Sequence, residues 1–180
     1  MVIKRAKPFR HVRSPAYTRK SKKRQLNFIK GWLPVKVQKF VMGNIEAFQE
    51  GKFTHYVWLK SKDAVQIRDN ALEACRRQVL RYLEKKVGKN NFYFLIVPYP
   101  HQVLRENKML TGAGADRLQT GMQLAFGSVV GNAAVVEPDE AIFLVATTKD
   151  YVELVRNIYK SISPKLPCRT KVEIEQKNRK

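Results

Sequence analysis

The sequence predicts an α+β fold with a mixed, mainly antiparallel sheet and two amphipathic helices. Strand-like runs outnumber helical ones, and the two helices do not alternate with strands in a regular βαβ repeat. Hydrophobic residues make up 44% of the 180 residues, which is enough for one core. We therefore predict a single α+β domain at residues 32–175, between a basic arm at residues 1–31 and a loose tail at residues 176–180.

Six runs have the alternation, or the aromatic and β-branched composition, that is typical of strands. They lie at residues 34–42, 53–60, 92–97, 132–136, 141–147 and 168–175. The sequence Glu137-Pro138-Asp139-Glu140 predicts a turn between the fourth and fifth runs.

The clearest helix follows the second run. We expect Ser61 to cap its N-terminus and Asp63 to lie in its first turn, with apolar residues at helical spacing as far as Val87 and a C-cap at Gly88. Cys75 is expected to be a small buried apolar residue of this helix. The second helix is expected at residues 149–162, before two prolines.

The opposite face of the first helix carries arginines, and two interpretations of them stay open. It is either a solvated helix face or a face laid against phosphates. The arginines on this face are Arg68, Arg76, Arg77 and Arg81.

The distribution of charge along the sequence is the strongest local indication of function. The formal net charge is +20, and the first 45 residues hold 13 Lys and Arg but no acidic residue before Glu46. A segment of one sign cannot neutralise itself by internal pairing, so alone in water we expect this arm to be disordered. Aromatic and proline residues interrupt the charges, as suits a chain that threads along nucleic acid. RNA, DNA and an anionic membrane all fit this charge.

Several classes of protein are excluded by what the sequence lacks. No run of about 18 apolar residues predicts a membrane span, and no apolar segment follows the basic N-terminus as in a secretory signal. The two cysteines lie in unrelated contexts, so we expect neither a disulfide framework nor a zinc site, and a reducing cytoplasm. The three histidines are scattered, so we predict no catalytic residues, no metal site and no cofactor.

A long glycine-rich loop is predicted at residues 105–131, where five of the nine glycines lie. A nucleotide-phosphate loop would need a different glycine spacing and a Walker lysine. A catalytic loop would depend on Asp116, with His101 as its partner. A loop inserted among RNA backbones fits both the glycines and the cations, and an ordinary mobile surface loop competes with it.

The run Lys108–Gly127, KMLTGAGADRLQTGMQLAFG, resembles the signature of one family. It is the universal large-subunit ribosomal protein L-sixteen family, in the form called L-ten-e in archaea and eukaryotes. Residues 98–105, 70–76 and 5–10 also resemble segments of that family, so the resemblance spans nearly the whole chain. The Lys-Trp-Gly-Phe tail of eukaryotic members is missing, which favours an archaeal member.

The resemblance implies a structural constituent of the large ribosomal subunit in the cytoplasm, and not an enzyme. Family members bind large-subunit rRNA near the aminoacyl-tRNA site and help to position tRNA. The implied partners are large-subunit rRNA, tRNA and neighbouring large-subunit proteins, with 5S rRNA left open, and neither a membrane nor a homo-oligomer is expected. The alternative is a free RNA- or tRNA-binding factor outside the ribosome.

The predicted site residues fall into two groups. The rRNA-binding residues of the arm are Lys4, Arg5, Arg10, Arg13, Arg19, Lys20, Lys22, Lys23 and Arg24. The residues of the loop expected nearest to tRNA are Arg105, Lys108, Gly112, Gly114, Arg117 and Gln119.

Overall fold

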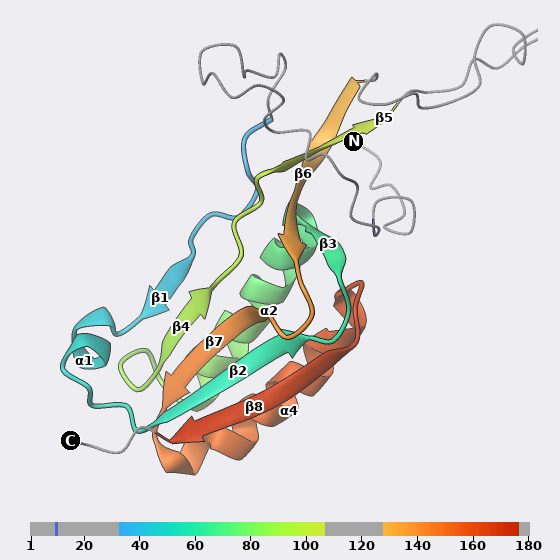
Figure 1. Cartoon of the computed structure of the whole chain (residues 1–180). Coiled ribbons are helices and arrows are strands. Elements are labelled where there is room, and N and C mark those ends of the chain that lie inside the picture. The colour runs from blue at the N-terminus through green and yellow to red at the C-terminus, as the bar shows by residue number, and fades with distance from the viewer. Residues whose placement is uncertain (1–9, 11–32, 107–127, 177–180) are drawn as a thin grey trace, which may run out of the picture.

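The computed structural model describes residue 10, residues 33–106 and residues 128–176. Most of the predicted arm, the centre of the predicted loop and the last four residues lie outside these ranges. The described residues form two antiparallel sheets with helices packed against them (Figure 1). This confirms the predicted α+β class and its mainly antiparallel pairing, with two sheets in place of one.

The larger sheet has five strands in the order β1-β4-β7-β2-β8. Neighbouring strands in this sheet pair antiparallel, with β7 and β2 at its centre. Its strands are β1 (Val41–Gly43), β4 (Tyr93–Ile96), β7 (Ala141–Thr147), β2 (His55–Ser61) and β8 (Thr170–Gln176).

The smaller sheet has three strands in the order β3-β6-β5, again all antiparallel. They are β3 (Val65–Arg68), β6 (Ser128–Val136) and β5 (Gln102–Glu106). Strands β5 and β6 extend into the predicted loop, at residues 105–106 and 128–131. Glu106 is the cross-strand partner of Ser128, so residues 107–127 leave and rejoin the sheet at one point.

Helices α2 (Asp69–Lys86) and α4 (Val152–Ile162) pack against each other and against the larger sheet (Figure 1). Their apolar faces bury Leu72, Val79, Val155 and Ile158. The hydroxyl of buried Tyr159 donates to the carbonyl of Val57 on β2 at 3.1 Å, so its polar atom has a partner in the core.

Two short 3-10 turns flank α4, and a short helix covers part of the larger sheet. The 3-10 turns η3 (Lys149–Tyr151) and η4 (Ser163–Lys165) precede and follow α4, close to the predicted bounds of 149–162. Helix α1 (Ile45–Gln49) covers an end of the other sheet face, where the Phe48 ring stacks on Tyr93 at 3.9 Å. No helix among the described residues is long and apolar enough to cross a membrane.

Several predictions for α2 are confirmed. Gly88 has φ +87°, and the N–H groups of Val87 and Gly88 both donate to the carbonyl of Leu83, as at a glycine C-cap. Cys75 is fully buried, and burial raises the pKa of its thiol to about 12. It is therefore an inert apolar residue of the core.

The predicted start of this helix is wrong. Ser61 ends β2, and its hydroxyl donates to the carbonyl of Asp63 at 2.7 Å instead of capping a helix. Residues 65–68 form β3, and α2 begins only at Asp69. The apolar Val65 and Ile67 fit a strand as well as a helix, because two positions are too few to distinguish the periods.

The predicted strand at 34–42 is also largely wrong, since only Val41–Gly43 pairs in the sheet. Upstream of β1, two backbone N–H groups bind carboxylates of α2 instead of a neighbouring strand. The N–H of Lys36 donates to Asp69 at 3.2 Å, and that of Gln38 donates to Glu73 at 3.4 Å. The alternation of Val35 and Val37 gives an extended segment, but its hydrogen bonds go to side chains.

Arg76 does not belong to an exposed helix face. It is 6% exposed and donates to both carboxylate oxygens of Glu73, at 2.7 and 2.6 Å, while Glu73 is itself 7% exposed. The Arg76 guanidinium lowers the pKa of Glu73, so the carboxylate stays charged in the folded protein. The pair is a two-pronged buried ion pair at i, i+3 spacing.

We predict that Arg76→Met destabilises the protein by about 3 to 5 kcal/mol, because it leaves the Glu73 carboxylate buried without its partner. The double variant Glu73→Leu/Arg76→Met should recover most of that loss. Urea unfolding measures both, with Arg77→Met, an exposed neighbour, as the matched control. Equal stability of Arg76→Met and Arg77→Met would show that the buried pair has no such role.

Candidate nucleic-acid interface

A basic groove runs between α2 and η4. It consists of two hollows of about 520 and 400 Å³ that share Ala74, Arg77 and Lys165 among their lining residues. Four cationic side chains line the groove, and none of the described residues that line it is acidic. The cations are Arg68, Arg77, Arg81 and Lys165.

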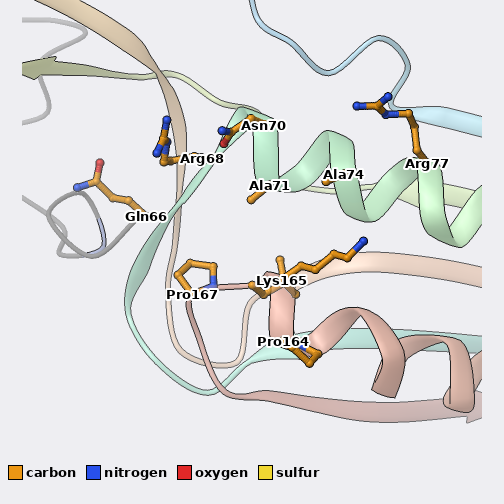
Figure 2. A pocket seen from close by; sticks show the side chains of 10 residues that line it. Gln66, Arg68, Asn70, Ala71, Ala74, Arg77, Pro164, Lys165 and Pro167 are labelled. Atoms are coloured by element: carbon orange, nitrogen blue, oxygen red, sulfur yellow. The ribbon is translucent and has the colours of Figure 1, made fainter. Parts of the chain in front are cut away.

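The fold explains how these four cations come together. Arg68 ends β3 immediately before α2, and Arg77 and Arg81 lie one turn apart on α2. Lys165 ends η4, the 3-10 turn that contains Pro164 and directly follows α4. Figure 2 shows Arg68 at one end of the groove and Lys165 extending beneath α2, with the Arg77 guanidinium directed away from η4.

A protein carboxylate neutralises Arg77 of the groove only weakly. The side chain of Arg77 is 72% exposed and its Nε lies 3.5 Å from Glu73, whose stronger partner is Arg76. Arg77, Arg81 and Lys165 are exposed, and exposed cations beside a concave surface are suited to hold the phosphates of a nucleic-acid backbone. Neither interpretation of the α2 arginines applies to buried Arg76, and both stay open for the exposed Arg77 and Arg81.

Arg10 is the one predicted arm residue that the structure describes, and it lies against the domain. Its carbonyl accepts from the N–H of Gln66, on the edge strand β3 and at one end of the groove, at 2.9 Å. Its guanidinium lies 3.7 Å from Asp63. Arg10 therefore contacts the domain beside the basic groove.

Asp63 holds two chain segments together. Besides Arg10, it binds Arg169, accepting from the backbone N–H at 3.1 Å and from the guanidinium at 2.8 Å. The hydrogen bonds from Arg169 lower the pKa of Asp63 from 3.8 to about 2. A carboxyl whose pKa falls on folding stabilises the protein above its unfolded pKa, and this contribution disappears as the pH falls through its folded pKa.

We predict that Asp63→Asn lowers the midpoint temperature of thermal unfolding by a constant amount above about pH 4. The difference from wild type should close between pH 4 and pH 2, as Asp63 is protonated in the wild-type protein. Thermal unfolding from pH 7 to pH 2 measures it. Glu153→Gln, which removes an exposed ion-pair partner of Arg156, is the control. A difference that persisted unchanged at pH 2 would contradict this assignment.

The base of the arm and the base of the loop lie at the same sheet. The carbonyl of Leu33, the first residue described after the arm, accepts from the side chain of Asn132 on β6 at 2.7 Å. Asn132 is four residues from Ser128, or about 13 Å along a strand, and Ser128 is where the loop ends. Leu33, which follows the arm, and Ser128, which follows the loop, thus lie beside or on the same strand.

The other predicted site residues have mixed outcomes. Arg105 lies in β5, half-buried, at a bulge opposite Val129. The remaining predicted residues of the arm and the loop lie outside the described ranges, as does Asp116. His101 is exposed and contacts the Tyr99 ring, and no metal-binding group of acidic, Cys and His residues occurs in the described part of the chain.

Sequence reasoning missed Lys165 and the burial of Arg76. No local pattern marks Lys165, because the groove is formed by elements that are far apart in the sequence. The Glu73–Arg76 spacing was a usable signal, since i, i+3 pairs meet on one helix face.

An α+β domain with a basic groove and a strongly cationic arm is the structure of a nucleic-acid-binding protein. The sequence pattern of the family described as Ribosomal protein L16p/L10e matches residues 13–173, so the chain belongs to this family. The predicted family is therefore confirmed, and with it the prediction that the protein is not an enzyme.

Three archaeal relatives cover almost the whole chain, and each is named large ribosomal subunit protein uL16. The protein of Sulfolobus acidocaldarius is 41% identical over 99% of this chain and 97% of its own length. The protein of Saccharolobus solfataricus is 42% identical over 97% of this chain and 93% of its own length. The protein of Pyrobaculum calidifontis is 40% identical over 98% of this chain and 96% of its own length. They agree with the predicted archaeal form.

Proposed function

We propose that this protein is a constituent of the large ribosomal subunit that binds large-subunit rRNA near the aminoacyl-tRNA site and helps to position tRNA. Its partners are rRNA, tRNA and neighbouring large-subunit proteins. Family membership and the names of its relatives support the ribosomal assignment. The basic groove between α2 and η4 is the observation that carries the RNA-binding part.

The groove, the arm and the loop each make a different contribution to RNA binding in this proposal. The groove presents fixed cations to one stretch of RNA backbone, since it is built on a helix and a packed turn. The arm contributes the largest excess of positive charge and neutralises further phosphates, which releases counterions. Recognition of this kind depends mainly on the shape and backbone of the folded RNA.

The loop has a separate role in this proposal. The resemblance of residues 108–127 to the family signature supports placing Arg105, Lys108, Arg117 and Gln119 nearest to tRNA. The RNA carries out the chemistry of peptide-bond formation, and the protein supports the position of the tRNA acceptor end.

We predict that Arg77→Gln, Arg81→Gln and Lys165→Gln each weaken rRNA binding by the full-length chain and make it less dependent on salt. Each lost phosphate contact should lower the slope of log affinity against log salt concentration by about one. Filter binding at several salt concentrations measures the slope. Arg156→Gln is the matched control, since Arg156 is an exposed arginine of α4 that does not line the groove. Groove variants that behaved like the control would contradict the proposed role.

Sedimentation distinguishes the proposal from a free RNA- or tRNA-binding factor. A sucrose gradient of native lysate at about 0.5 M salt removes proteins held by surface phosphate contacts alone. We expect the protein to stay in the large-subunit peak. Its release to the top of the gradient would favour the free factor.

A further inference from the structure

The segment between β4 and β5 presents aromatic rings to solvent. Pro98 and Pro100 are buried, whereas Tyr99 and His101 are exposed, so anchored and exposed residues alternate. Each proline fixes its own φ angle and restricts the residue before it. The two rings are therefore held on a segment that has little conformational freedom to lose on binding.

A third ring joins them from a distant part of the sequence. The Phe40 ring stacks on Tyr99 with centroids 5.2 Å apart and planes inclined by 25°. The His101 ring lies 4.6 Å from Tyr99 on a plane tilted by 47°. The carbonyl of Phe40 accepts from the N–H of Ile96 at 2.9 Å, which fastens the two segments together. We call Phe40, Tyr99 and His101 the ring platform.

The platform lies on an open surface. Tyr99 is 45% exposed although it contacts two other rings, and Val97 and Val41 beside it are 40% and 37% exposed. Exposed aromatic and apolar groups that are gathered in this way mark a contact surface.

We infer that the ring platform stacks an unpaired nucleobase of the rRNA. Aromatic rings bind bases of any sequence through their faces, and proteins reach such bases in loops and bulges of folded RNA. The chemistry around the platform favours RNA over an apolar protein segment. Lys39 is exposed next to Phe40, and the whole chain carries a net charge of +20. This inference rests on the proposed binding to rRNA and adds a base contact to its phosphate contacts.

Ultraviolet cross-linking of native large subunits tests the inference, because irradiation joins a base to an aromatic ring stacked on it. After digestion with nuclease and trypsin, the peptide of residues 90–105 should carry a nucleotide located on Tyr99 or His101. Nucleotides on other peptides of this protein but not on this one would overturn the platform alone. Absence of the protein from the large subunit would overturn the proposed function as well.

Two variants separate stacking from a purely structural role of the rings. Tyr99→Ala/His101→Ala should lower the stacking equilibrium roughly 5- to 150-fold. The nucleotide of one unpaired rRNA base should then become mobile, and so reactive to a reagent that acylates flexible 2′-hydroxyl groups, in subunits that still contain the protein. Tyr99→Phe keeps the ring and should leave that nucleotide protected. Identical reactivity in both variants and wild type would contradict the inference, and so would a platform cross-linked to a protein segment.

Discussion

Two carboxylates of α2 hold the extended segment upstream of β1 against the helix. Asp69 and Glu73 lie one turn apart, and each accepts a backbone N–H from the extended segment that follows the arm. Glu73 can remain charged in the interior because Arg76 donates two hydrogen bonds to it. This segment then brings Leu33 beside β6 and Phe40 onto Tyr99. Leu33, beside β6, and Phe40, in the ring platform, therefore lie on the segment that the two carboxylates hold.

Carboxylates and groove cations occupy different places in the described structure. Carboxylates inside or against the domain are used to hold chain segments, as Glu73 and Asp63 do with Arg76 and Arg169. The cations of the groove, by contrast, lie on a concave surface without an acidic residue among its described lining. Arg77, Arg81 and Lys165 are thus left on the surface, where in the proposed function an RNA backbone supplies the opposite charge.

The sequence predicted the fold class, the C-cap of α2 and the buried Cys75, because each depends on local periodicity or local backbone conformation. It could not predict the start of α2, since Val65 and Ile67 pair with a strand that is distant in the sequence. It could not predict the groove either, because Lys165 and Arg77 line the same hollows only through the packing of α4 and η4 on α2. The predicted family followed from one long motif, whereas the platform combines residues from two unrelated segments.

Amide hydrogen exchange, measured by NMR on the full-length chain, tests most directly whether the α2 carboxylates hold the segment. We expect the amides of Lys36 and Gln38 to be protected although neither lies in a strand. In Glu73→Leu/Arg76→Met, Gln38 should lose its protection while Lys36, which binds Asp69, keeps it. Exchange of both amides at the rate of an unstructured peptide in the wild-type protein would contradict the account.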